Sequence, residues 1–230
     1  MGGFIGYMNP NTNCLIEDCH VAGARMHTSV PGLGGFCALI IPRGVSSPSR
    51  RAVFRNCTVQ LVNLAEGEKV SGGFAGQCSL ASGFFNEPYK VIFEECESQA
   101  DLSCTGEQVG GFIGLCNIGS FVNCRAAGRV TGAARTGGFA GEFSQKDSDF
   151  EVSAVQCKAD TDVFQSGSLT DGGFGGFAGY SNAVSISQCG ATGTVTSSSE
   201  GSSAFLGEID GTAITECYST GSLLAALNGA

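Results

Sequence analysis

Apolar and polar residues recur along this chain in a fixed order. A Gly-Gly-Phe segment is followed by a polar residue and a Cys, and then by positions that alternate between apolar and polar. Residues 110–141, with the sequence GGFIGLCNIGSFVNCRAAGRVTGAARTGGFAG, contain one whole unit and the opening of the next. Alternation with a period of two indicates short, half-buried strands. The pattern therefore predicts a β-protein built from repeats.

Two anchor positions align seven repeats. Successive anchor Cys residues are 28 to 39 residues apart, and the shortest distance from Phe to Cys within a repeat is 12 residues. We predict that both anchors point inward and stack from repeat to repeat. The Phe ladder comprises Phe4, Phe36, Phe74, Phe112, Phe139, Phe177 and Phe205. The Cys ladder comprises Cys19, Cys57, Cys96, Cys124, Cys157, Cys189 and Cys217.

The residues around each anchor Cys predict a bend in the chain. The third residue before the Cys is always apolar, as in Phe121, whereas the residue directly before it is always polar, as in Asn123. Because two inward positions three residues apart do not fit a straight strand, a bend or bulge is expected between them. The Gly pairs before each Phe are expected at corners that need a positive φ or a close backbone approach.

Short strands at equivalent places in each repeat cannot bury their apolar faces singly, but they can do so by stacking in register. We therefore predict an all-β fold, a single-stranded parallel β-helix (β-solenoid) of about seven coils of 28–39 residues. Residues 1–230 would form one repeat domain. At about 4.8 Å per coil, the rod would be roughly 30–35 Å long.

Composition agrees with this fold and argues against some classes of binding partner. The chain has 36 Gly, no Trp and 14% charged residues, which suits tight turns and strands better than helices. A net charge of −9 argues against a nucleic-acid partner, which needs clustered Lys and Arg. The sequence contains no apolar run long enough for a transmembrane segment, and its first residues lack the pattern of a signal peptide.

The succession GGFIG, NC, GRVTG and GGFAG resembles the GLUG-motif repeat, which occurs in bacterial surface proteins and in non-catalytic regions of some immunoglobulin-A metallopeptidases. The resemblance covers essentially the whole chain. It implies adhesion or display at an extracellular or cell-surface location. Two features depart from the family pattern: Phe stands where an aliphatic residue is usual, and several repeats carry long insertions. The chain contains no HExxH peptidase signature.

The twelve Cys residues allow two interpretations besides simple burial, which are disulfides and metal binding. Stacked strands hold equivalent Cβ atoms farther apart than a disulfide usually does, so we predict small, buried, free thiols in the Cys ladder. No CxxC pair is present, and His20 and His27 are isolated. We therefore expect no metal site and no cofactor.

Charged residues after the anchor Cys suggest a second type of surface. In three successive repeats the outward positions place Glu97 beside Arg125 and Lys158, with a further acid–base–acid set beside them. That set consists of Asp101, Arg129 and Asp162, with Asp160 nearby. One hypothesis is a carbohydrate-processing face, as on polysaccharide lyases and hydrolases with a parallel β-helix. The other is a cross-strand charge ladder that only supports the fold.

Insertions in the second and third repeats give the candidate binding site. They lie between Phe and Cys of neighbouring repeats, so their loops are expected to leave the rod on the same edge. The candidate residues are Arg43, Arg50, Arg51, Phe84, Phe85, Tyr89 and Lys90. Exposed aromatic rings beside Arg would suit a protein or glycan ligand on a host or neighbouring cell. The alternative is that Phe84 and Phe85 fold back over the rod.

Two further features suggest self-association. The residue after each ladder Phe, such as Ile113, is apolar although it is expected to point away from the Phe, so it would form a covered stripe or a flat face for lateral association. Incomplete repeats at both ends indicate a segment of a longer array, or ends that are covered by partners.

From these features we predict a non-catalytic structural and interaction module of a cell-surface or secreted adhesin-like protein. The alternative is a carbohydrate-active enzyme that uses the charged face.

Overall fold

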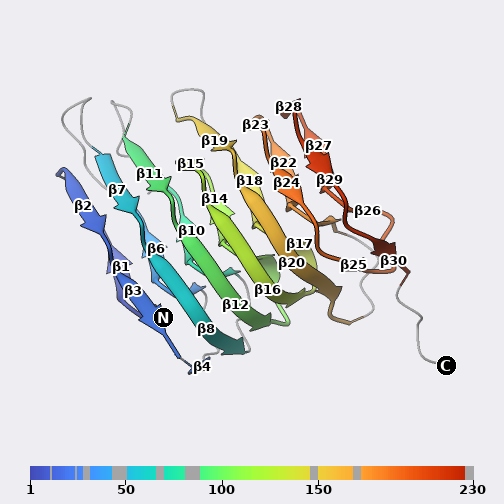
Figure 1. Ribbon diagram of the computed structural model, residues 1–230, viewed down its shortest axis with the longest axis horizontal. Coiled ribbons are helices and arrows are strands. Elements are labelled where there is room, and N and C mark those ends of the chain that lie inside the picture. Colours follow the sequence, from blue (N-terminus) through green and yellow to red (C-terminus); the bar gives the residue numbers. More distant parts are fainter. Residues whose placement is uncertain are drawn as a thin grey trace.

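The computed structural model describes residues 1–10, 12–23, 25–27, 32–42, 51–65, 70–80, 89–145, 150–167 and 172–225, with only the backbone described for residues 61–65. Within these ranges the fold is all-β, without a helix, and all its strand pairs are parallel. Strands of successive repeats lie side by side along the long axis of the molecule (Figure 1). The all-β prediction and the parallel stacking of equivalent strands are thus confirmed.

The strands form four sheets, which we number in the order in which the chain enters them. The first sheet contains β1 (Ile5–Met8), β6 (Cys37–Ile40), β10 (Ala75–Cys78), β14 (Ile113–Cys116), β18 (Ala140–Ser144), β22 (Ala178–Asn182) and β27 (Leu206–Asp210). The second sheet contains β2 (Cys14–Glu17), β7 (Arg51–Arg55), β11 (Lys90–Glu94), β15 (Gly119–Val122), β19 (Val152–Val155), β23 (Ser185–Ser187) and β28 (Ala213–Thr215). The third sheet contains β3 (His20–Ala22), β4 (Arg25–His27), β8 (Thr58–Ala65), β12 (Glu97–Ser103), β16 (Arg125–Gly132), β20 (Lys158–Gln165), β24 (Gly190–Ala191), β25 (Val195–Thr196), β29 (Tyr218–Ser219) and β30 (Leu223–Leu224). The fourth sheet contains β5 (Leu33–Gly34), β9 (Ser71–Gly72), β13 (Glu107–Gly110), β17 (Ala134–Gly137), β21 (Phe174–Gly175) and β26 (Ser202–Ser203).

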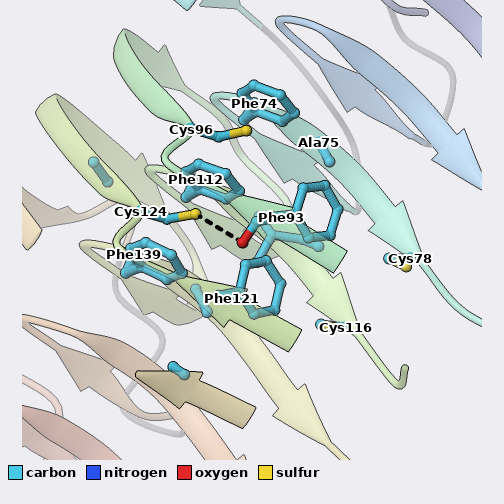
Figure 2. Packing of buried hydrophobic residues seen from close by; sticks show 14 of the residues in the cluster. Phe74, Ala75, Cys78, Phe93, Cys96, Phe112, Cys116, Phe121, Cys124 and Phe139 are labelled. Carbon is cyan, nitrogen blue, oxygen red and sulfur yellow. Dashed lines mark hydrogen bonds between the residues drawn. The ribbon is translucent and has the colours of Figure 1, made fainter. Parts of the chain in front are cut away.

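The Phe ladder forms the centre of the core, as predicted. Its rings stack face to face, and Phe112 lies 4.8 Å from Phe74 and 4.9 Å from Phe139 between ring centroids. A second column from the second sheet, which includes Phe93 and Phe121, meets the ladder edge-on at 5.8 and 5.7 Å from Phe112 (Figure 2). Offset stacks and edge-to-face pairs are the favourable geometries for aromatic rings. Stacking in register therefore satisfies both geometries at once in the middle of the rod.

The Cys ladder lies beside the Phe ladder, and its thiols have a structural role. The Sγ of Cys124 donates to the carbonyl oxygen of Phe93 in the preceding repeat at 3.4 Å (Figure 2). Cys57, Cys96, Cys189 and Cys217 make the equivalent bond. All twelve Cys residues are free thiols. Burial raises the pKa of Cys124 well above its usual value, so this thiol stays protonated and unreactive.

The predicted bend before each anchor Cys is present and has a defined geometry. The polar residue directly before the Cys is in the left-handed region in all seven repeats, with φ of 53° at Asn123 and 54° at Glu95. One residue in this conformation turns the chain from the second sheet into the third. This turn lets two residues three positions apart, such as Phe121 and Cys124, both point into the core.

The Gly pairs before each Phe serve close backbone approach, and positive φ is not the reason for them. A Cβ on Gly111 would lie 2.1 Å from the carbonyl oxygen of Gly138, which is the equivalent residue of the next repeat. The same contact recurs from Gly3 to Gly176. Of the two reasons that the sequence suggested for glycine at this position, the structure therefore supports close approach.

The apolar residue after each ladder Phe lies in the core or packs against it, so of the two interpretations that the sequence left open, a covered stripe and a flat outer face, the structure supports the covered stripe. Ile113 and Ala140 are fully buried in the same cluster as the Phe ladder. The reason is that Phe112 lies in a bend and the strand begins one residue later, so strict alternation does not extend back to the Phe. This column therefore offers no flat outer face for lateral association.

Candidate functional site

The two long insertions begin and end on neighbouring strands, as the sequence predicted. The first connects β6 to β7 and the second connects β10 to β11. In each sheet these strands are paired in register, and Arg51 at the start of β7 lies opposite Lys90 at the start of β11. Both side chains are exposed. The candidate residues Arg43, Arg50, Phe84 and Phe85 lie outside the described residues.

Tyr89 does not have the exposed position that a ligand contact requires. Its side chain is 1% exposed and belongs to the hydrophobic core, and its hydroxyl lies 3.5 Å from the carbonyl oxygen of Thr12. The prediction of Tyr89 as a binding residue is therefore wrong. Its ring packs inward at the base of the insertion, because the apolar body gains more from burial than the single hydroxyl loses.

A shallow pocket of about 330 Å³ lies beside Arg51 on the outer face of the second sheet. It is lined by Asn13, Cys14, Leu15, Arg51, Val53 and Arg55. The backbone N–H of Arg51 donates to Oδ1 of Asn13 at 3.1 Å, which fixes the start of β7 against the first repeat. Leu15 is 56% exposed and forms an apolar wall of this pocket.

An ion-pair ladder borders the pocket, and the sequence analysis missed it. The guanidinium of Arg55 donates to Glu17 at 3.0 Å and to Glu94 at 2.8 Å. These three residues share the second position before the anchor Cys in successive repeats, so the acid–base–acid order was visible in the sequence. The two carboxylates raise the pKa of Arg55, first through the hydrogen bond to Glu94. Arg55 is therefore already paired within the chain.

The charged face on the third sheet has the predicted register but lacks the contacts of an active site. Arg129 lies opposite Asp101 and Asp162 on adjacent strands. Its guanidinium, however, lies 4.0 Å above the ring of Phe164, and no ion pair with either Asp occurs in the described structure. Asp162 accepts the backbone N–H of Thr194 at 2.9 Å. Each of these groups is thus engaged with the rod itself or open to solvent.

Asp160 is the best-connected carboxylate on this face. It accepts from Arg125 at 2.8 Å and from Lys158 at 2.8 Å, and Arg125 also pairs with Glu97 at 3.1 Å. Partial burial alone would raise the pKa of Asp160, but hydrogen bonds from Lys158, Thr192 and Arg125 outweigh it and lower the pKa. A carboxylate held ionised by two cations is a poor general acid, so the geometry fits the charge-ladder hypothesis.

We expect Asp160→Asn to lower stability at neutral pH, because Asp160 has a lower pKa in the folded chain than in the unfolded chain. Such a group stabilises the fold above its unfolded pKa of about 3.9, and this contribution disappears as the pH falls through the folded pKa. The difference between wild type and variant should be about 1 kcal/mol or less at pH 7, since both cations are largely exposed, and should vanish near pH 2. Urea unfolding at both pH values measures it; a difference that persists at the low pH would contradict the assignment.

A second pocket, of about 310 Å³, was not predicted. It is lined by Glu107, Ala134, Arg135, Gly172 and Glu208. Arg135 donates to the buried carboxylate of Glu142 at 2.7 Å and lies 4.9 Å above the ring of Tyr180. Arg135 has a φ of 43°, a backbone conformation that no feature of the sequence indicates. Because the guanidinium of Arg135 is paired with Glu142, the described lining of this pocket contains no unpaired cation like Arg51.

Among the residues that the structure describes, exposed large apolar side chains are confined to the first and last repeats. Within the described chain they are Met1, Phe4, Tyr7, Leu15, Ile209, Ile214, Tyr218, Leu223 and Leu224. Some of them, such as Phe4 and Ile214, occupy columns that are buried in the interior repeats, as at Phe36 and Ile186. Association through the two ends stays a prediction.

Comparison with known proteins found no matching family model, no matching curated protein and no matching solved structure. Across the ranges that the structure describes, no helix has the length and apolar character needed to cross a membrane. The same ranges contain no group of three or more His, Cys, Asp or Glu side chains placed to hold a metal ion. The expectation that the protein needs no cofactor stays a prediction.

Proposed function

We propose that this chain is a β-solenoid of seven coils that acts as a non-catalytic interaction module, displaying the loops of its second and third repeats to a protein or glycan ligand. The observation that carries this proposal is the register of β6 with β10 and of β7 with β11. This register anchors both long insertions side by side on one edge of a stacked, parallel scaffold. Loops held by a rigid scaffold are frequent binding elements.

The cell-surface or secreted location of the module is part of the same proposal and rests on the resemblance to GLUG-motif repeats. The non-catalytic role is supported by the third sheet, where three of the four residues that suggested an enzyme, Arg129, Asp160 and Asp162, contact other parts of the rod. Asp160 is held by Arg125 and Lys158, and Arg129 lies over Phe164. These contacts are those of a surface that supports the fold.

The proposal is tested by binding of the labelled chain to glycan and cell-surface protein arrays. We expect Phe84→Ser combined with Phe85→Ser to weaken array binding about tenfold or more, because aromatic side chains dominate the energy of many interfaces. The matched control is Tyr218→Ser, which removes an exposed aromatic ring on β29 in the last repeat, away from the strands that anchor the insertions. The control should bind as the wild type does. Absence of any array ligand, or equal binding by the loop variant, would contradict the proposed function.

A further inference from the structure

The cations of this chain fall into two groups. The sequence contains twelve Lys and Arg residues, of which eight lie in the described ranges. Four of these form ion pairs with carboxylates, namely Arg55, Arg125, Arg135 and Lys158. Arg129 lies over an aromatic ring. Among the described residues, Arg25, Arg51 and Lys90 have neither kind of partner.

Arg51 and Lys90 differ from Arg25 because they are neighbours. Their Cα atoms are paired in register on the adjacent parallel strands β7 and β11. Like charges directly opposite each other on neighbouring strands destabilise a sheet. The described rod has another like-charge pair in register, Arg125 opposite Lys158, but both of these cations bond to Asp160, whereas Arg51 and Lys90 have no ion-pair partner among the described residues. A departure of this kind from local stability rules is typical of functional sites.

The unpaired cations border an apolar surface. Leu15 and Val53 line the pocket beside Arg51; Leu15 is more than half exposed, whereas Val53 is 7% exposed and Ile92 beside it is partly exposed. Val53 is paired in register with both Leu15 and Ile92, so the three residues form an aliphatic row next to the cations. We call this surface, made by Arg51, Lys90, Leu15, Val53 and Ile92, the cationic edge. It offers positive charge and aliphatic contact within the same few strands.

We propose that the cationic edge binds an acidic peptide segment in which carboxylate side chains alternate with aliphatic ones. This inference rests on the proposed function and names the ligand class for the same edge of the scaffold. Arg binds a carboxylate through two parallel hydrogen bonds, and the Lys ammonium takes the second carboxylate as a point charge. The protein as a whole carries a charge of −9, whereas Arg51 and Lys90 form a local region of positive charge. This region favours an anionic ligand.

A peptide fits this surface better than a sugar. Sugars are commonly bound by stacking on aromatic rings, and no described residue that lines the pocket is aromatic. The nearest aromatic candidate, Tyr89, is buried. In an extended peptide, alternate side chains lie about 7 Å apart, a separation that the long side chains on strands about 4.8 Å apart can reach.

Three probes test this inference by fluorescence anisotropy with the full chain. They are a blocked peptide of alternating Glu and Leu, its counterpart with Gln in place of Glu, and tetragalacturonate. We expect the Glu–Leu peptide to bind, its affinity to fall with added salt, and Arg51→Gln and Lys90→Gln each to weaken it about tenfold. The matched control is Arg25→Gln, which removes the same charge from an exposed cation on β4 and should leave the affinity unchanged.

Four outcomes would overturn the inference. One is equal binding of the Gln–Leu peptide, and another is an equal loss on Arg25→Gln, which would indicate only a general charge effect. The third is that tetragalacturonate alone binds and depends on Arg51, which would make the ligand an acidic sugar. If array binding depends on Phe84 and Phe85 while the Glu–Leu peptide does not bind, the proposed function stands and this inference fails. Thermal unfolding of each variant confirms that the fold is intact.

Discussion

Phe112→Ala is expected to lower the free energy of unfolding by about 3–5 kcal/mol, the usual cost of removing a fully buried Phe side chain. The ring stacks on Phe74 and Phe139 and meets Phe93 and Phe121 edge-on, so its loss leaves a cavity bounded by four other rings. Rings that are held in register by paired strands cannot collapse into that space without disturbing the sheets.

The control for this prediction comes from the same ladder. Phe4 stacks on Phe36 at 4.9 Å but is 55% exposed, because no earlier repeat covers it within this chain. Phe4→Ala should therefore cost about 1 kcal/mol or less. Urea unfolding followed by circular dichroism compares the two variants. Similar costs at the two positions would show that the ladder is not the centre of the core.

Gly111→Ala is expected to be nearly as damaging, although it adds only one methyl group. The new Cβ would lie 2.1 Å from the carbonyl oxygen of Gly138, which is backbone and cannot rotate away. Two adjacent repeats would have to separate, and we expect a loss of about 3 kcal/mol, at the upper end of the usual cost of overpacking. The same unfolding experiment measures this loss.

Gly6→Ala is the matched control, because a Cβ at Gly6 meets no atom within 4 Å. It should leave stability unchanged or raise it by up to about 1 kcal/mol, since alanine restricts the unfolded chain. An unchanged stability in Gly111→Ala would show that the repeats are less closely stacked than described.

Features that depend on spacing could be predicted from the sequence. The Phe and Cys ladders, the parallel stacking, the bend before each Cys and the neighbouring anchors of the long insertions all follow from residues that recur at equivalent places. These features can be read from a repeat because each residue contacts the equivalent residue of the next repeat. The pairing of Arg51 with Lys90 belongs to the same class, since both residues directly end an insertion.

Features that depend on where the chain bends could not be predicted. Ile113 is buried because the strand starts after Phe112, and no residue type marks that start. Tyr89 is buried because its ring packs into the hydrophobic core at the base of the insertion. Its residue type alone suits an exposed binding residue equally well. Arg135 has a left-handed backbone conformation, its guanidinium bonds to Glu142, and arginine has no preference for that conformation.

The sequence by itself therefore determined the class of fold and the columns that stack within it, because the spacing of the repeats can be read directly from the order of the residues. Only the tertiary structure decided which charged side chains form ion pairs. Arg125 and Arg129 lie on the same strand with acidic residues opposite both, yet Arg125 bonds to Glu97 and Asp160 whereas Arg129 lies over the ring of Phe164. The reason is that register fixes which residues are neighbours, whereas the packing of each long side chain decides which neighbour it contacts.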